Sequence, residues 1–341
     1  MAGRMAVGKR QDGVWVMVRV GSFNLNNLFS RFNFATEVDQ LPDPDAAAPV
    51  QIVTRLDPAD PGRAKFRTFK GTLVRPKDPK DRARVAERIA AMDADVLAVQ
   101  EVEDVTTLTA FAATELAGLG YRHVVLVEGN DQRLIDVGLL SRLPIGAVTS
   151  WRHAVHHRTD TEPVFSRDLL QVDILTASRS RRLLTVFNTH LKSQFCDFRE
   201  DPIACQEHNN LLRERQAATA ARIIAEQTRP TSRYLLCGDM NDTPDSAPLA
   251  PLVADSTLRL INGLADAVPD RPAPLDTPPA PARPWSTRFK EPGKPATYQL
   301  LDQIWLSPAT ADRLTAAGIG RRTRLTRDGT DHDPVWVDLN L

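Results

Sequence analysis

Short apolar runs dominate this chain, and they constrain its fold more than any other feature of the sequence. Most are joined by short polar loops, which is typical of β-strands in antiparallel pairs. The runs that predict strands lie at 14–25, 95–99, 121–127, 135–141, 145–151, 169–175, 183–189, 234–237, 299–306 and 335–341.

Helical periodicity is confined to three stretches, 81–92, 106–119 and 207–227. In the first, Val85, Ile89 and Met92 recur at the spacing of one helix face. Helices this few and unevenly spaced do not fit the strict alternation of a parallel doubly wound fold. The pattern therefore predicts an α/β chain with two mainly antiparallel sheets covered by helices.

Two proline-rich polar stretches, near 36–78 and 269–284, interrupt this pattern. We expect both to be surface inserts, the first with a hairpin at 66–74. Neither divides the chain into two cores, so the sequence predicts a single domain over residues 1–341.

The charges of the chain balance, with 43 Lys and Arg against 43 Asp and Glu. A protein that holds nucleic acid mainly by counterion release carries a basic excess. Any attraction for phosphate must therefore come from a local site or a metal ion. The basic runs 179–182 and 321–324 are interpreted as solvated faces, with contact to a polyanion as the alternative.

Three cysteines, Cys196, Cys205 and Cys237, are too few for a disulfide scaffold. We expect reduced thiols, with a bridge between Cys196 and Cys205 as the alternative. The N-terminal segment has no continuous apolar core of a Sec-type signal peptide. This predicts a cytoplasmic protein, with a processed secreted chain as the alternative. No apolar run is long enough to span a bilayer, and no feature indicates an oligomeric state.

Polar side chains follow the apolar runs, where a rigid scaffold can aim them into one cleft. Asn24 and Asn26 share a face of the first strand, although asparagine at a strand end is also a common turn former. Glu101 follows the buried run 95–99 after one residue, Gln100. A carboxylate there is either paired or metal-bound, or it points into water.

Two further clusters follow the runs 183–189 and 234–237. His190 and Lys192 share a face, which is compatible with phosphate binding or with a structural histidine. Asp239 and Asn241 also share a face, where they can hold a water and orient a phosphoryl oxygen. Gly238 before them allows close approach of the backbone.

The last two clusters contain a buried acid and an acid–histidine pair. Asp302 lies inside an apolar run and needs a partner, for which a histidine is the natural choice. Asp331 and His332 form the arrangement of a base with an orienting acid. Oxygen donors with few cysteines favour Mg²⁺ or Mn²⁺ over zinc.

The ordered motifs FNLNN, VQE, DVGLLSR, NTHLKS, GDMND, LDQIWLS and TDHDPV resemble the endonuclease/exonuclease/phosphatase superfamily. This superfamily includes DNase I, abasic-site endonucleases, bacterial sphingomyelinases and inositol polyphosphate 5-phosphatases. The resemblance extends from about residue 18 to residue 341. It implies a four-layer α/β/β/α sandwich of the DNase I type, with two mixed, mainly antiparallel sheets and a divalent metal at one end.

The resemblance also implies roles for individual residues. Glu101 resembles the principal metal carboxylate, with Asn24 and Asp331 beside it. Asp239 resembles the residue that positions or deprotonates the attacking water, and Asn241 the amide that orients the phosphate.

The remaining roles concern the histidines and the phosphate contacts. His332 resembles the catalytic histidine, with Asp302 holding its imidazole, and His190 resembles the second histidine of DNase I and the sphingomyelinases. Arg167 and Lys192 are candidate phosphate contacts. Asn26 departs from the aspartate of abasic-site endonucleases, which weakens that particular assignment.

Three functions compete on this reading. The first is a divalent-metal-dependent nuclease that cleaves phosphodiester bonds of DNA or RNA by in-line attack of water. The second is a phosphodiesterase or phosphatase acting on a small-molecule or lipid phosphoester. The third is a binding module that has lost its chemistry, and the intact set of acids and histidines disfavours it. We expect a phosphoester substrate, with nucleic acid preferred, and no membrane span.

Overall fold

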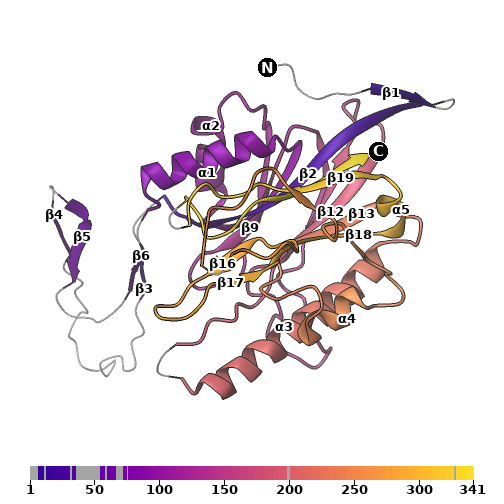
Figure 1. Ribbon diagram of the computed structural model, residues 1–341. Coiled ribbons are helices and arrows are strands. Elements are labelled where there is room, and N and C mark those ends of the chain that lie inside the picture. Colours follow the sequence, from indigo (N-terminus) through magenta and orange to yellow (C-terminus); the bar gives the residue numbers. More distant parts are fainter. Residues whose placement is uncertain are drawn as a thin grey trace, which may run out of the picture.

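The computed structural model describes residues 7–10, 13–30, 33–35, 54–57, 60–66, 72–74, 76–197, 200–277, 279–325 and 328–341. Most of the stretch predicted as the insert at 36–78 lies outside these residues. Two large sheets occupy the middle of the molecule, with α1 (Pro79–Met92) and α2 (Val105–Thr114) on one side and α3 (Pro202–Gln227) and α4 (Ala250–Val253) on the other (Figure 1).

The first sheet has the strand order β15-β19-β20-β2-β7-β9-β8, with β1 paired to β2. Only the pairs β2–β7 and β15–β19 are parallel. Its strands are β1 (Val7–Arg10), β2 (Gly13–Leu28), β7 (Val96–Val102), β8 (His123–Leu126), β9 (Asp136–Ser141), β15 (Val268–Pro269), β19 (Leu314–Ile319) and β20 (Val335–Asn340).

The second sheet has the order β10-β11-β12-β13-β18-β14, in which only β12 and β13 are parallel. Its strands are β10 (Ile145–Ser150), β11 (Leu169–Leu175), β12 (Arg182–His190), β13 (Tyr234–Asp239), β14 (Ile261–Asn262) and β18 (Asp302–Leu306). The smaller elements are β3 (Asn33–Ala35), β4 (Thr54–Asp57), β5 (Asp60–Phe66), β6 (Thr72–Val74), β16 (Thr287–Phe289), β17 (Thr297–Gln299), the 3₁₀ turn η1 (Ala247–Leu249) and α5 (Pro308–Ala311).

Three apolar clusters hold these layers together. One lies between the sheets and joins strand residues of both, such as Val20 and Val186. A second packs α1 and α2 onto the first sheet, and a third packs α3 and α4 onto the second. This is the predicted α/β/β/α sandwich, and the fold class is confirmed.

Local signals explain where the long helices begin. Asp78 accepts a hydrogen bond from Lys80 N and Asp201 accepts from Ala204 N, and a proline follows each cap. The predicted helix at 207–227 therefore starts earlier, at Pro202, because the Asp–Pro start lies in a loop without apolar periodicity.

Two strand predictions need correction. The hairpin predicted at 66–74 is wrong, because β5 pairs with β4 and β6 pairs with β3. The strand predicted at 299–306 divides into the end of β17 and β18, which starts at Asp302. No described helix has the length and apolarity that crossing a membrane requires.

Candidate active site

The ends of several strands meet at one edge of the sandwich. In the second sheet, His190 pairs with Asp239 at the ends of the parallel strands β12 and β13, and Asp302 pairs with Asp239 at the start of β18. In the first sheet, Asn24 pairs with Gln100 on the parallel strands β2 and β7, and β20 begins beside Ser22. The predicted polar clusters therefore converge because the sheet registers bring them together.

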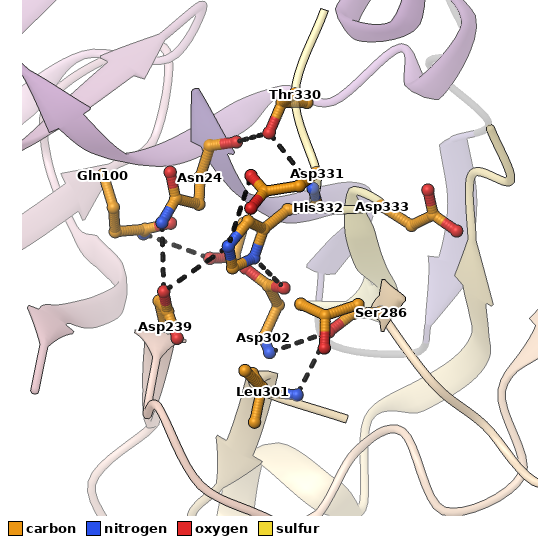
Figure 2. Close-up of polar contacts among 12 residues, drawn as sticks. Asn24, Gln100, Asp239, Ser286, Leu301, Asp302, Thr330, Asp331, His332 and Asp333 are labelled. Carbon is orange, nitrogen blue, oxygen red and sulfur yellow. Dashed lines mark hydrogen bonds and ion pairs between the residues drawn. The ribbon is translucent and has the colours of Figure 1, made fainter. Parts of the chain in front are cut away.

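Asp239 contacts residues of both sheets, and Figure 2 shows its contacts with Asn24 and His332. Its Oδ2 accepts a hydrogen bond from Asn24 Nδ2 at 3.0 Å, and its Oδ1 accepts from Asn241 N at 2.9 Å. Oδ2 also lies 3.5 Å from His190 Nε2 and 3.8 Å from His332 Nε2. Burial, reinforced by the charge of Asp302 and opposed by His332, raises the pKa of Asp239 to about 6.

His332 is held by a buried carboxylate. Its Nδ1 lies 2.7 Å from Asp302 Oδ2, and Asp302 is fully buried. Burial alone would lower the pKa of His332, but the charges of Asp302 and Asp239 outweigh it and hold this pKa well above its usual value. The imidazole is therefore kept as imidazolium at neutral pH.

Two side-chain hydroxyl groups hold the backbone of Asp302 and of His332 in place. Ser286 Oγ accepts from the backbone N of Leu301 and of Asp302, and Thr330 Oγ1 accepts from His332 N (Figure 2). Thr330 Oγ1 in turn donates to Asn24 O at 2.9 Å. The loop before β20 is thus tied to β2.

The carboxylates of Glu101 and Asp331 contact Asn24 and Asn26, and they form a corner of the site next to Asp239. Glu101 has a φ of 60°, a left-handed conformation that turns its side chain away from the strand path. Its Oε1 accepts from Asn24 Nδ2 at 3.2 Å, and its Oε2 from Asn27 N at 3.0 Å. Asp331 accepts from Asn26 Nδ2, and its side chain is 65% exposed.

The donor chemistry of this corner fits a hard divalent ion, because every donor is an oxygen. Within the described part of the chain, however, no three acidic, histidine or cysteine side chains are gathered as a ready metal site. Asn24 presents its Nδ2 to the carboxylates, and its Oδ1 accepts from Asn26 N. In this arrangement Asn24 bridges the carboxylates of Glu101 and Asp239, and its Oδ1 retains one lone pair.

Lys77 is a residue of this corner that the sequence did not reveal. Its Nζ donates to Asn26 O at 2.7 Å. Burial lowers its pKa, and the charges of Asp81, Glu101 and Asp331 oppose that effect. Lys77 lies in the proline-rich stretch predicted as surface, so no local signal marked it.

The phosphate-contact candidates lie on the other side of Asp239. His190 is buried, and burial, followed by the charge of Arg167, lowers its pKa well below its usual value. Arg167 pairs with Asp131 at 2.8 Å and donates to Leu191 O. Lys192 lines, with Arg133 and Arg167, a cavity of about 950 Å³.

Asn241 is positioned by backbone as much as by side chain. Its φ is 52°, and its Nδ2 donates to Leu191 O at 3.0 Å. The preceding Gly238 has a φ of 136°, and a Cβ there would lie 1.8 Å from Thr189 O. The close approach predicted for Gly238 is confirmed, and it brings Asp239 against β12.

Two buried amide side chains, Gln100 and Asn188, hydrogen-bond to each other next to the site. Gln100 Nε2 donates to Asn188 Oδ1 at 2.7 Å, and Asn188 Nδ2 donates to Val99 O and Gly138 O. This pair links β7 of the first sheet to β12 of the second, and Gln100 is the residue that pairs with Asn24 on β2. Sequence reasoning missed it, although a polar residue directly after the run 95–99 and another inside the run 183–189 were the available signal.

The expectation of reduced thiols at Cys196 and Cys205 is wrong for this structure. The two residues form a disulfide, with Cα atoms 6.0 Å apart, because the loop after β12 folds back onto the first turn of α3. Cys237 is buried and free.

A central carboxylate, an acid–histidine pair and a group of oxygen donors on this sandwich define the phosphoesterase class of site. The model of the Endonuclease/Exonuclease/phosphatase family matches residues 21–332. The chain therefore belongs to this family of hydrolases, which act on phosphoester bonds and generally use divalent metals.

Solved structures resemble the chain along most of its length. The mannosyl-6-phosphatase Bt3783 of Bacteroides thetaiotaomicron is 16% identical, with a TM-score of 0.54 over 95% of this chain and 100% of that one. An AP endonuclease from Archaeoglobus fulgidus is 17% identical, with a TM-score of 0.52 over 78% and 96%.

The catalytic domain of human nocturnin is 16% identical, with a TM-score of 0.54 over 94% of this chain and 93% of that one. At these identities the likeness shows the fold alone. No curated protein matches the chain in sequence.

Proposed function

We propose that this protein hydrolyses phosphodiester bonds with the help of a divalent metal ion, and that nucleic acid is its substrate. The observation that carries the proposal is the contact network around Asp239. It joins two histidines, one of which is paired with the buried Asp302, at one edge of the sandwich. Phosphoester hydrolysis needs these functions together, namely a base for water, an acid for the leaving oxygen and donors for the phosphate.

Glu101 and Asp331 are the carboxylates that would hold the metal, with Asn24 beside them. Oxygen donors of this kind suit Mg²⁺ or Mn²⁺. When bound, such an ion draws charge from a non-bridging phosphate oxygen.

The pKa directions divide the acid and base roles between Asp239 and His332. Burial raises the pKa of Asp239 to about 6, so this carboxylate can accept a proton from water near neutral pH. Asp302 holds His332 as imidazolium, which can stabilise charge on the phosphoryl group or protonate the leaving alkoxide.

The residues on the opposite side of Asp239 are suited to bind the phosphate. His190 has a lowered pKa and is therefore neutral, so its imidazole can donate one hydrogen bond without carrying charge. Asn241 donates one amide hydrogen to Leu191 O and retains a second for a phosphoryl oxygen. Arg167, which shares the carbonyl of Leu191 with Asn241, and Lys192 supply positive charge for the phosphate. In the metal corner, Asn26 orients Asp331 through a hydrogen bond.

Nucleic acid is the first candidate substrate. Arg133, Arg167 and Lys192 line the large cavity, where they could contact the phosphates that flank a scissile bond. The lining also includes the carboxylates of Asp131, Glu162, Glu200 and Asp201. The similar fold of the AP endonuclease from Archaeoglobus fulgidus supports this choice.

A small-molecule or lipid phosphoester is the second candidate. The net charge of zero favours it, because the whole protein exerts no general attraction on a polyanion. The similar fold of the mannosyl-6-phosphatase Bt3783 supports it as well.

A plasmid-nicking assay beside a panel of phosphomonoesters and phosphodiesters, each with and without Mn²⁺, tests the proposal. Metal-dependent nicking with slower turnover of small esters is the expected result. Turnover of small esters with intact plasmid would move the second candidate to first place. Metal-dependent binding without turnover of any substrate would refute hydrolysis.

A further inference from the structure

A concavity lined by arginines lies at the end of the second sheet opposite the candidate active site. The parallel strands β12 and β13 finish at His190 and Asp239. At their other end, Arg182 begins β12 and Arg233 directly precedes β13. The concavity measures about 690 Å³, and Arg181, Arg182, Arg229 and Arg233 line it with the hydroxyls of Thr231 and Ser232. Among the residues that the structure describes, no carboxylate lines it.

Two ordered turns present these arginines. In the turn between β11 and β12, Thr176 N donates to Arg181 O at 2.9 Å. In the connection from α3 to β13, Ser232 N donates to Arg229 O, and Arg229 N donates to Ser232 Oγ. Ser307 Oγ donates to Ser232 O and ties this turn to the start of α5. The guanidinium groups are therefore carried on fixed backbone.

The positive charge in this cavity is largely uncompensated. Arg182 has a carboxylate neighbour, Asp173 at 3.3 Å, and its side chain is 53% exposed. Across the described ranges, no carboxylate pairs with Arg181, Arg229 or Arg233, whereas buried arginines elsewhere, such as Arg88 and Arg213, have acidic partners.

Arg233 shows the effect of this crowding. Its side chain is half-buried, and burial, followed by the charges of Arg313 and Arg181, lowers its pKa. In a chain with equal numbers of acidic and basic residues, such a cavity is a local departure from charge balance. A bound polyanion would remove the repulsion.

We propose that this distal arginine cavity, formed by Arg181, Arg182, Arg229 and Arg233, binds an anion with two or more adjacent phosphoryl groups. Guanidinium groups form paired hydrogen bonds with phosphate oxygens, and hydroxyl groups supplement them. A polyphosphate chain and the backbone of a single-stranded nucleic acid share this chemistry.

The cavity is separate from the active site. β12 runs from Arg182 in the cavity to His190 in the site, a span of eight residue steps, or about 26 Å at 3.3 Å per residue. The phosphoryl groups bound here are therefore not the one that would be hydrolysed, and the proposal does not rest on the proposed function.

The test compares the double variant Arg181→Ala/Arg233→Ala with Arg122→Ala/Arg158→Ala. The second pair removes the same charge from exposed positions outside the cavity. The probes are tripolyphosphate, followed by calorimetry, and a fluorescein-labelled oligothymidylate, followed by anisotropy, both in EDTA. We expect at least about tenfold weaker binding by the cavity variant, because two guanidinium contacts are lost. The salt slope for the oligothymidylate should fall by about 1.4.

The two probes distinguish the sources of the phosphoryl groups. An effect on the oligothymidylate alone assigns the cavity to nucleic acid, and an effect on tripolyphosphate alone assigns it to a small anion. Equal binding by the wild type and the cavity variant, or an equal loss in the control pair, would overturn the proposal.

Two further measurements separate binding from folding. The cavity variant should keep the wild-type melting temperature and its rate with a small phosphodiester. In the unaltered protein, tripolyphosphate should slow hydrogen exchange at 176–182 and 228–233. Exchange that is unchanged there would contradict the proposal whatever the variant does.

Discussion

The contact between His332 and Asp302 gives the sharpest prediction about the active site. In the Asp302→Asn variant, the side chain keeps its size but loses its charge. Asp302 is fully buried and its Oδ2 lies 2.7 Å from His332 Nδ1. The variant therefore loses a charge-assisted hydrogen bond at a position shielded from solvent. Such a bond contributes about 1.5–3 kcal/mol.

The expected loss of rate follows from that free energy. At about 1.4 kcal/mol for each factor of ten, kcat should fall by about tenfold to 10²-fold if the whole contribution acts in the transition state. The pKa of His332 should fall as well, because Asp302 is the strongest influence that raises it. The activity lost on the alkaline side of the pH profile should therefore be lost at lower pH in the variant.

The assay is the pH profile of hydrolysis of a small phosphodiester. Asp338→Asn is the matched control, because it removes a carboxylate that accepts from Arg19 on the far part of the first sheet. A kcat for Asp302→Asn within about twofold of wild type, with an unchanged alkaline limb, would refute the assigned role of the pair.

Four other predictions test separate parts of the structure. Carboxyl ¹³C NMR of the metal-free protein should show a group that titrates near pH 6 and disappears in Asp239→Asn, and a titration near pH 4 would contradict the burial argument. Burial raises the pKa of Asp136 to about 7, so its folded form holds a proton that the unfolded chain releases near pH 4. The free energy of unfolding should therefore fall by up to about 4 kcal/mol from pH 4 to 7, and urea titrations of Asp136→Asn should show a flatter profile. Asp333→Asn should destabilise the fold by about 3–5 kcal/mol in urea, because three arginines share this fully buried carboxylate; a change below about 1 kcal/mol would contradict that. Under denaturing, non-reducing conditions, a thiol reagent should modify a single cysteine, Cys237.

The sequence predicted the layers of the fold because the apolar periodicities reflect burial. The run 169–175 matches β11, and the stripe of Val85, Ile89 and Met92 is the buried face of α1. The sequence did not predict strands whose formation depends on pairing with a distant segment. β19 has the sequence LTAAGI, which is only weakly apolar, and it is a strand because it pairs with β20.

The sequence also predicted which residues gather in the site, but not how they contact one another. Polar groups at strand ends were visible, and the sheet registers then placed Asp239 between His190 and Asp302. The orientation of the Asn24 amide toward Glu101 and the contact of Lys77 with Asn26 depend on packing between segments distant in sequence. A pattern along one segment does not contain that information.

Hydrolysis of a phosphodiester in Mn²⁺, before and after addition of EDTA, by wild type and His332→Ala side by side, tests the central claim most directly. The account predicts turnover in Mn²⁺ that EDTA abolishes and a loss of about 10²-fold or more in the variant. Full activity in EDTA, or in His332→Ala, would contradict it.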